Sequence, residues 1–399
     1  MDITVFPQHL EGTIEAIPSK SQAHRALICA AFSDEATKII CRQTNEDIEA
    51  TADCLNALGA TIQRTDYGYH VTPVRAIPTT ATLNCRESGS TLRFMLPVTG
   101  GLGVDTTFVL AGRLPNRPLS PLWEEMERMG CVLTRPTKNT IRCQGKLQAG
   151  NYSIDGGVSS QFITGLLFAT ALIPGTSEIH ITGKLESLPY IRLTQQVLQH
   201  FGVNTTEYKV SGSYPFTSPK EMKIEGDWSN GAFFLVAKAL GNNLTLSNLD
   251  LNSAQGDSAC VKILEQLTNE HAVIDCKDIP DLVPVLSIAA ATMHGAIFQN
   301  IGRLRLKESD RVESVLSMLK ALGADCSANT DAMEVHPAQF KSCIIDSVND
   351  HRIAMSAAIA ATVATGPITI LGADCVKKSY PSFWDEYNRL GGHYEQYIR

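Results

Sequence analysis

Six segments of the chain share one pattern, an amphipathic helix that ends at a similar point, in five cases followed by glycine. They are ADCLNALGATI (52–62), WEEMERMGCVL (123–133), QQVLQHFGVNT (195–205), VKILEQLTNEH (261–271), LSMLKALGADC (316–326) and FWDEYNRLGGH (383–393). Glycine past a helix can adopt the left-handed conformation that satisfies the last carbonyls. Gly59, Gly130, Gly202, Gly323 and Gly391 are therefore predicted helix C-caps. Their spacing predicts a repeated unit that is somewhat longer than sixty residues.

Each repeat is expected to combine strands with two helices. A hairpin-like segment is predicted after each of these helices, as in TIQRTDYGYHVTP, and other apolar helices such as SSQFITGLLFATALI fall between them. Six copies suit two domains of three copies, with the boundary between the third and fourth, where Asp227 or Ser229 can cap a new helix. The alternative is that LxxLG endings recur by chance in an α/β protein.

Composition limits the class of protein. The 399 residues carry a net charge of −7, which argues against a surface that binds nucleic acid, so any anion site must be local. The 11 cysteines are scattered, odd in number and without a CxxC pair, which argues against a zinc site and a disulfide scaffold. Neither a signal peptide nor an apolar run long enough for a membrane span is seen. A soluble, cytoplasmic protein is expected.

Several polar motifs stand at predicted helix starts, where free N–H groups favour anions. PSKSQAHRA carries Lys20, Ser21 and Arg25, and SGSTLR carries Gly89 and Arg93. Further motifs provide Arg117 in a proline-rich loop, Ser159, Ser160 and Gln161 in GGVSSQF, and Ser187 and Tyr190 in SLPY. Each motif taken alone is explained equally well or better by simple capping or a solvated side chain.

The second half of the chain adds carboxylates to the cations. Asp281 stands at the start of an apolar helix, and LKESDR contains Lys307, Glu308 and Arg311. Arg352 lies at the start of an alanine-rich helix, and Lys378 precedes the last helix. A surface salt bridge would explain the 308–311 pair as well as a site does. The concentration of cations at helix starts and loops nevertheless indicates a small polyanion bound between two domains. Asp281 and Glu308 are then the candidates for proton transfer.

The motifs PSKSQAHRA, SGSTLR, NRP, GGVSSQF, SLPY, DIPD, LKESDR, NDHR and KKSYP occur in an order that resembles the 5-enolpyruvylshikimate-3-phosphate synthase family from end to end. The resemblance implies a two-domain inverse α/β, barrel-like fold with three βαβαββ repeats in each domain. It implies that residues 19–226 form one domain, mainly for shikimate 3-phosphate. Residues 1–18 and 227–399 would form the other, with the phosphoenolpyruvate site and catalytic acids, and with the active site in the cleft between them.

The resemblance also implies roles for individual residues. Phosphoenolpyruvate is expected to bind Lys20, Gly89, Arg117, Gln161, Arg311, Arg352 and Lys378. Shikimate 3-phosphate is expected to bind Lys20, Ser21, Arg25, Ser159, Ser160, Gln161, Ser187, Tyr190, Asp281 and Lys307. The shikimate 5-hydroxyl would add to C2 of the enol ether, after which phosphate leaves. Lys20, Asp281 and Glu308 are the expected catalytic residues, without a cofactor or metal, in a monomer of the shikimate pathway.

Two positions depart from the family pattern, and two rival functions are disfavoured by residues of this chain. Glu87 stands where relatives often carry Asn and Arg303 where some use Asn, which leaves sensitivity to the family inhibitor glyphosate undecided. The sister transferase that acts on UDP-N-acetylglucosamine usually carries a cysteine where this chain has Gly112. A catalytically silent, anion-sensing protein of the same fold is the other rival.

Overall fold

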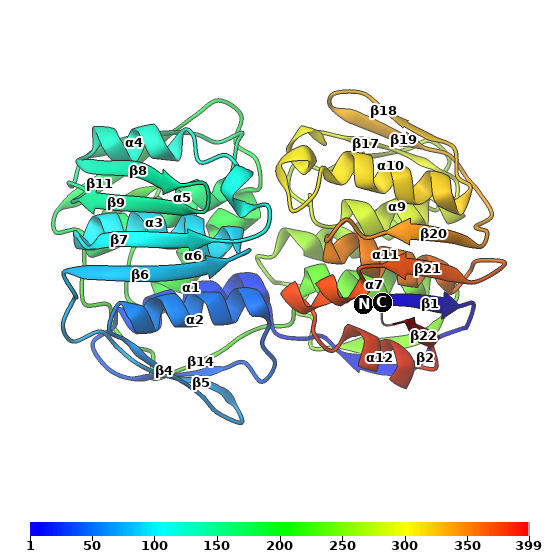
Figure 1. The fold of residues 1–399 in the computed structure, drawn as a ribbon, viewed down its shortest axis with the longest axis horizontal. Coiled ribbons are helices and arrows are strands. Elements are labelled where there is room, and N and C mark those ends of the chain that lie inside the picture. The colour runs from blue at the N-terminus through cyan, green and yellow to red at the C-terminus, as the bar shows by residue number, and fades with distance from the viewer. Residues whose placement is uncertain (398–399) are drawn as a thin grey trace. The chain divides into compact units, whose positions relative to one another are not determined.

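The computed structural model describes residues 1–397, which form two compact units (Figure 1). The continuous unit is Pro18–Glu225, and the interrupted unit joins Met1–Ile17 to the chain from Gly226 onward. These boundaries lie one residue before the predicted ones. The chain thus leaves the interrupted unit after its first two strands and returns to it at Gly226.

In the continuous unit, helices alternate with single strands or with runs of three strands. Its elements are α1 (Lys20–Ala31), β3 (Thr37–Ile40), α2 (Glu46–Ala57), β4 (Thr61–Arg64), β5 (Gly68–Thr72), β6 (Thr80–Arg86), α3 (Gly89–Leu102), β7 (Asp105–Leu110), η1 (Leu114–Asn116), α4 (Leu122–Arg128), β8 (Cys131–Thr137), β9 (Thr140–Gly145), β10 (Asn151–Asp155), α5 (Ser160–Leu172), β11 (Thr176–Thr182), α6 (Leu188–His200), β12 (Thr205–Thr206), β13 (Lys209–Ser211) and β14 (Glu221–Lys223).

The interrupted unit repeats this alternation. Its elements are β1 (Asp2–Phe6), β2 (Glu11–Glu15), α7 (Trp228–Ala239), β15 (Asn243–Ser247), η2 (Gly256–Ala259), α8 (Cys260–Gln266), β16 (Ala272–Asp275), α9 (Val283–Thr292), β17 (Ala296–Gln299), η3 (Gly302–Leu306), α10 (Arg311–Leu322), β18 (Cys326–Ala328), β19 (Ala332–Val335), β20 (Cys343–Asp346), α11 (His351–Ala361), β21 (Ile368–Leu371), η4 (Ala373–Lys378), α12 (Phe383–Arg389) and β22 (His393–Tyr397).

Five sheets share one four-stranded plan, which confirms the predicted repeat. The sheets have the strand orders β14-β3-β5-β4, β6-β7-β9-β8, β10-β11-β13-β12, β16-β17-β19-β18 and β20-β21-β1-β22. In each, the first two strands are parallel and the other pairings are antiparallel. A helix connects the two parallel strands in four of these sheets, whereas β14 and β3 come from the two ends of the continuous unit. Strand β1 pairs with β21 and β22, so the N-terminal strand completes the last repeat.

The predicted hairpin after every repeat helix is wrong for the fourth copy. Helix α8 ends at Gln266 and β16, which belongs to the next sheet, begins at Ala272. Five residues are too few for two strands and a turn, so this repeat keeps only the two-stranded sheet β15-β2. In the sixth copy β22 follows α12, and its hairpin partner is supplied by β1 rather than by the next residues.

The predicted C-cap glycines are confirmed. Gly59, Gly130, Gly202, Gly323 and Gly391 have φ angles of 98°, 112°, 77°, 99° and 93°. At Gly130 an added Cβ would also lie 2.6 Å from the carbonyl oxygen of Lys146. Both the conformation and the space at that turn therefore exclude other residues.

Wholly or nearly wholly buried helices form the centre of each unit. Every residue of α11 is buried, as is every residue of α9 except Thr292 and every residue of α5 except Gln161. All eleven cysteines are unpaired thiols, ten of them buried. No helix within residues 1–397 has the length and apolar character needed to cross a bilayer. These helices fill the core of each unit. Their polar first residues are therefore the places where a ligand could contact polar groups of the buried helices.

Candidate active site

In the continuous unit, three helices begin with a side-chain cap at predicted motifs, and a fourth, α2, begins with a cap outside them. Ser19, Ser88 and Ser159 accept hydrogen bonds from the backbone N–H of Gln22, Thr91 and Gln161 at 3.4, 3.2 and 3.3 Å. Asn45 caps α2 in the same way. The capping interpretation of these serines is therefore correct, and it leaves Lys20, Gly89 and Ser160 as the first residues of α1, α3 and α5. Free N–H groups and the helix dipole favour an anion at such ends.

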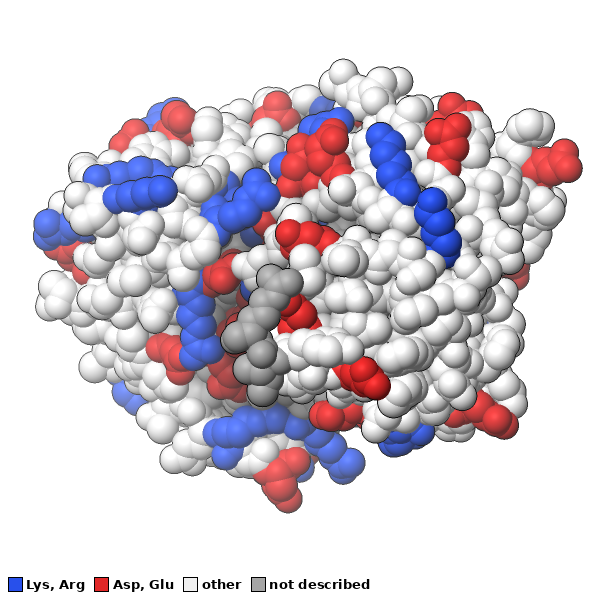
Figure 2. Space-filling model, turned by 45° about the vertical axis from the view of Figure 1, so that its right-hand side comes forward, with Lys and Arg blue, Asp and Glu red and all other residues white. Residues whose placement is uncertain are grey.

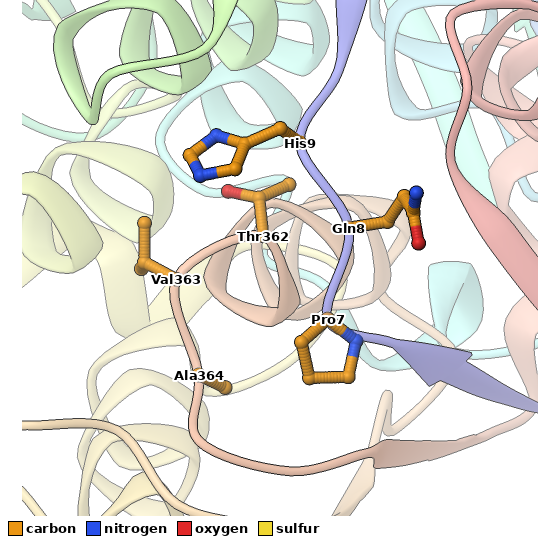
Figure 3. Close-up of a pocket in the computed structure, with 6 residues that line it drawn as sticks. All are labelled: Pro7, Gln8, His9, Thr362, Val363 and Ala364. Atoms are coloured by element: carbon orange, nitrogen blue, oxygen red, sulfur yellow. The ribbon is translucent and has the colours of Figure 1, made fainter.

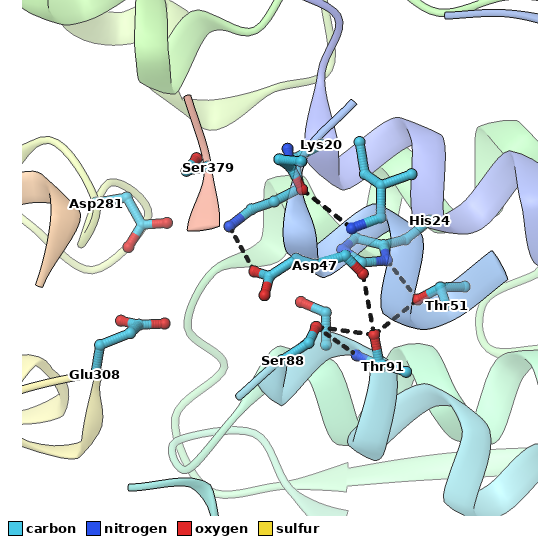
Figure 4. A network of polar contacts seen from close by, with 12 residues as sticks. Lys20, His24, Asp47, Thr51, Ser88, Thr91, Asp281, Glu308 and Ser379 are labelled. Atoms are coloured by element: carbon cyan, nitrogen blue, oxygen red, sulfur yellow. Dashed lines mark hydrogen bonds and ion pairs between the residues drawn. The ribbon is translucent and has the colours of Figure 1, made fainter. Parts of the chain in front are cut away.

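Polar contacts join these helix starts to one another. Lys20 Nζ lies 2.9 Å from Asp47 Oδ2, which links α1 to α2 (Figure 4). Gln161 accepts from Arg93 Nη1 at 2.7 Å and donates to Ser90 Oγ at 2.9 Å, which links α5 to α3. We call Lys20, Asp47, Gly89, Arg93, Arg117 and Gln161 the helix-start cluster.

Arg117 packs directly on the first turn of α3. A Cβ placed on Gly89 would lie 2.5 Å from Arg117 Nη1 and 3.0 Å from its Cζ, closer than atoms in contact. The glycine therefore lets a guanidinium approach the helix N-terminus. Two positive elements, the guanidinium and the helix end, then face the same place.

Arg25 lies inside the continuous unit. It is 2% exposed, and it donates to Thr194 Oγ1 at 2.8 Å, to the Ser21 carbonyl at 2.6 Å and to the Tyr190 carbonyl at 3.0 Å. Burial lowers the pKa of Arg25 to about 10. Arg25 therefore links α1 to α6 through the carbonyls of Ser21 and Tyr190. Its direct contact with substrate stays a prediction.

Ser187, Tyr190 and Ser160 stand at the starts of α6 and α5. Ser187 is buried and holds the left-handed conformation with a φ of 56° just before α6. Tyr190, in the first turn of α6, is half-buried, and Ser160 is buried at the first position of α5. Arg25 joins α1 to α6 through the Tyr190 carbonyl and to α5 through Thr164 Oγ1 at 3.4 Å, so these serines and the tyrosine belong to the same group of helix starts as Lys20.

In the interrupted unit, Asp281 gathers three cations. Its Oδ1 lies 3.2 Å from Lys307 Nζ and 2.8 Å from Arg311 Nη1, and its Oδ2 lies 3.1 Å from Arg352 Nη2. Arg352 Nη1 also donates to the Asp281 carbonyl. Asp281 stands just before α9, and Arg311 and Arg352 lie in the first turns of α10 and α11, so three helix starts converge on one carboxylate.

Arg311 is the hub of this group. It is fully buried, and it donates to Glu308 Oε2 at 2.7 Å and through Nε to Asp350 Oδ2 at 3.0 Å. Burial lowers the pKa of Arg311, but Asp350, Glu308 and Asp281 outweigh that effect and raise it above its ordinary value. Asp281, Lys307, Glu308, Arg311, Asp350 and Arg352 form what we call the Arg311 cluster.

Lys307 and Lys378 lie at the edges of this cluster. Burial lowers the pKa of Lys307 to about 8, although Asp281 opposes the effect, and Arg311 adds to it. Lys378 Nζ donates to the carbonyl of Asn349, next to Asp350, at 3.0 Å. The interrupted unit thus brings together every residue that the sequence predicts for it, and it mixes cations with two partly exposed carboxylates, Asp281 and Glu308.

One face of the molecule and one hollow outside the clusters show no second group of predicted site residues. On the face drawn in Figure 2, lysines and arginines stand among acidic residues, so the positive charge there is not gathered into a continuous patch. A shallow hollow of the interrupted unit is lined by Pro7, Gln8, His9, Thr362, Val363 and Ala364 (Figure 3). Its lining holds one titratable side chain, His9, and includes none of the predicted site residues.

The sequence assigns no site role to two acidic members of the clusters. Asp47 follows the cap Asn45 in the acidic first turn of α2, and its only local signal is the ordinary preference for acids there. Asp350 is the N-cap of α11 and accepts a hydrogen bond from the Arg352 N–H at 3.0 Å. The sequence indicates this capping role and gives no sign of the ion pair with Arg311. Long-range pairing, rather than spacing, identifies both.

Comparison with known proteins agrees with this geometry. The family described as EPSP synthase (3-phosphoshikimate 1-carboxyvinyltransferase) matches residues 6–387. Proteins named 3-phosphoshikimate 1-carboxyvinyltransferase from Clostridium kluyveri and Clostridium botulinum are 38% and 36% identical over 420 and 425 residues, covering 99% and 98% of this chain and 98% of each relative.

Solved structures show the same fold. EPSP synthase from Acinetobacter baumannii superimposes with a TM-score of 0.81 at 23% identity, over 99% of this chain and all of that chain. The enolpyruvyl transferase NikO from Streptomyces tendae superimposes with a TM-score of 0.75 at 14% identity, over 99% of this chain and 98% of that chain. At these identities the likeness concerns fold. The match to the family and to its curated members shows that the chain belongs to the EPSP synthase family.

Proposed function

We propose that this chain transfers the enolpyruvyl group of phosphoenolpyruvate to the 5-hydroxyl of shikimate 3-phosphate. The products are 5-enolpyruvylshikimate 3-phosphate and phosphate, on the shikimate route to aromatic amino acids. The observation that supports the proposal most is the pair of polyanion-suited clusters in a member of this family. Each substrate brings a carboxylate and a phosphate, so their mutual repulsion must be offset by fixed cations.

We propose that both clusters bind one pair of substrates. Phosphoenolpyruvate would be held by Lys20, the α3 start at Gly89 with Arg117, and Gln161, together with Arg311, Arg352 and Lys378. Shikimate 3-phosphate would be held by Ser21, Ser159, Ser160, Gln161, Ser187 and Tyr190, with Arg25 beneath them, and by Lys20, Asp281 and Lys307. The incoming anions would compete with Asp47 and Asp281 for the lysines and arginines that those carboxylates now engage.

The proposed reaction proceeds by addition and elimination. The 5-hydroxyl oxygen bonds to C2 of phosphoenolpyruvate and loses its proton, while C3 gains a proton, which gives a tetrahedral adduct. The C2–O bond to phosphate then breaks as C3 gives up a proton, which restores the C2–C3 double bond and gives the enol ether of the product. Asp281 is proposed as the base toward the hydroxyl, and Glu308 or Lys20 as the acid toward C3.

One observation favours this acceptor over UDP-N-acetylglucosamine. Gly112 has a φ of 55°, and a Cβ placed there would lie 2.4 Å from Cδ of Glu87. The position at which the sister transferase usually carries a cysteine is therefore closed to a side chain unless Glu87 moves. A chemistry that needs a thiol at this position is not supported by such a site.

We further propose that the enzyme works as a cytoplasmic monomer without a cofactor or metal. The free thiols, ten of them buried, suit a reducing compartment. Light scattering coupled to size-exclusion chromatography measures the oligomeric state, and full activity in excess chelator is expected. A stable dimer, or activity lost to a chelator and restored by metal, would contradict this part of the proposal.

The acceptor is tested with a panel of substrates. Purified protein is mixed with phosphoenolpyruvate and either shikimate 3-phosphate, unphosphorylated shikimate or UDP-N-acetylglucosamine, and phosphate release is followed. We expect rapid phosphate release with shikimate 3-phosphate. With unphosphorylated shikimate we expect a lower kcat/KM, because the cations that bind the 3-phosphate group have no anion to bind. Turnover with UDP-N-acetylglucosamine alone would overturn the proposal, and binding of both substrates without turnover would favour the anion-sensing alternative.

A further inference from the structure

A chain of buried hydroxyl groups runs from His24 to the start of α3. His24 Nδ1 lies 2.7 Å from Thr51 Oγ1, which lies 2.7 Å from Thr91 Oγ1 (Figure 4). Thr91 Oγ1 in turn donates to Ser88 Oγ at 2.8 Å and approaches the Asp47 carbonyl at 3.4 Å. All four side chains of the chain are buried.

The direction of this chain follows from counting protons. Each threonine hydroxyl has one proton to donate. Thr91 uses its proton toward Ser88 or the Asp47 carbonyl, so Thr51 must donate to Thr91. Thr51 then has no proton left for the imidazole, and it must accept one from His24 Nδ1. His24 is therefore the neutral Nδ1–H tautomer.

The other ring nitrogen agrees with this assignment. Nε2 of His24 is buried and has no hydrogen-bond partner among the residues that the structure describes. Burial, with the cations Lys20 and Arg25 close by, lowers the pKa of His24 well below its ordinary value. A neutral ring therefore adds no charge beside two groups that are already cationic.

We propose that His24 is a positioning residue of the anion site. Its ring is part of α1, one helical turn after Lys20, whereas Thr51 belongs to α2 and Thr91 to α3. The directed chain fixes the relative register of three helix starts, and with it the places of Lys20, Asp47 and the Gly89 N-terminus. This inference rests on the proposed function only in taking phosphoenolpyruvate as the bound anion.

The tautomer is tested without any turnover. Nitrogen–proton correlation spectra of protein with ¹⁵N-labelled histidine distinguish the two ring nitrogens, and a His24→Asn variant identifies the signal among the 10 histidines. We expect Nδ1 to carry the only ring proton between about pH 6 and 8. An Nε2–H tautomer or a cationic ring would overturn the inference even if the enzyme is active.

The positioning role is tested with matched threonine variants. Thr51→Val breaks the chain, Thr51→Ser restores its hydroxyl, and Thr170→Val removes an equally buried hydroxyl that donates only within α5. We expect Thr51→Val to raise the KM for phosphoenolpyruvate, and the Kd for inorganic phosphate, about tenfold, or about 1.4 kcal/mol, with a smaller change in kcat. Equal behaviour of Thr51→Val and Thr170→Val in KM and phosphate binding would reduce the chain to a purely structural role and overturn the proposal.

Discussion

Substituting Gly89 by alanine tests how closely Arg117 and the α3 start share one anion. Gly89 is the first residue of α3, and its φ lies outside the left-handed region, so alanine meets no backbone strain there. Alanine is also the better helix former, by about 1 kcal/mol in a helix interior and by less at this first position. Folding stability should therefore be unchanged or slightly increased.

The effect on binding follows from the space above Gly89. The new Cβ would lie 2.5 Å from Arg117 Nη1, whereas ordinary contact begins at 3.4 Å, so the guanidinium must retreat by close to 0.9 Å. A misplacement of about 1 Å in a site can cost about 10²-fold. We expect the KM for phosphoenolpyruvate to rise about 10- to 100-fold, with a much smaller effect on shikimate 3-phosphate.

Steady-state kinetics with each substrate varied in turn, and urea unfolding, measure both effects. Gly231→Ala is the matched control, since the atoms nearest to its Cβ would be those of the flexible side chain of Leu249, the first at 3.2 Å. The reasoning is refuted if Gly89→Ala folds normally and keeps the wild-type KM for phosphoenolpyruvate, or if both substrates are weakened equally.

Three further changes test the clusters. Lys20→Ala should lower kcat/KM by about 10²-fold or more with an unchanged circular dichroism spectrum, and near wild-type activity would remove Lys20 from the site. Because the pKa of Lys307 is lowered to about 8 and anions bind its charged form, kcat/KM should fall as pH rises through 8; Lys307→Arg should shift that fall to higher pH, and an unchanged pH profile would argue against the role. Asp350→Asn should destabilise the protein by about 3 kcal/mol in urea unfolding at neutral pH, because Arg311 loses a buried charged partner; a loss no larger than that of exposed Asp346→Asn would contradict this.

Local sequence signals predict the helix ends well because their cause is local. A glycine in the left-handed conformation satisfies the carbonyls of its own helix, so Gly59 and Gly323 reveal their caps without knowledge of the rest of the chain. The fourth repeat shows the limit of this reasoning. Its helix is present, but the hairpin is missing, since the linker between α8 and β16 is only five residues long.

Pairings between distant residues are not visible in the sequence. Lys20 and Asp47 are 27 positions apart, and Asp281 and Arg352 are 71 apart, so their ion pairs depend on how the repeats pack. The sequence predicts Lys20, Asp281 and Arg352 as charged groups at helix starts. It does not indicate that Arg25 turns inward, because an arginine one turn after Lys20 fits either an anion site or a buried contact with α6.

Phosphorus NMR of a single reaction mixture tests the central claim most directly. Protein is added to equal amounts of phosphoenolpyruvate and shikimate 3-phosphate, and all phosphorus signals are followed together. The proposed transfer predicts that both substrate signals decline at the same rate, while inorganic phosphate and one new phosphate ester, 5-enolpyruvylshikimate 3-phosphate, grow in equal amounts. Release of phosphate from phosphoenolpyruvate without the new ester, or unchanged spectra under conditions in which both substrates bind, would contradict the assignment.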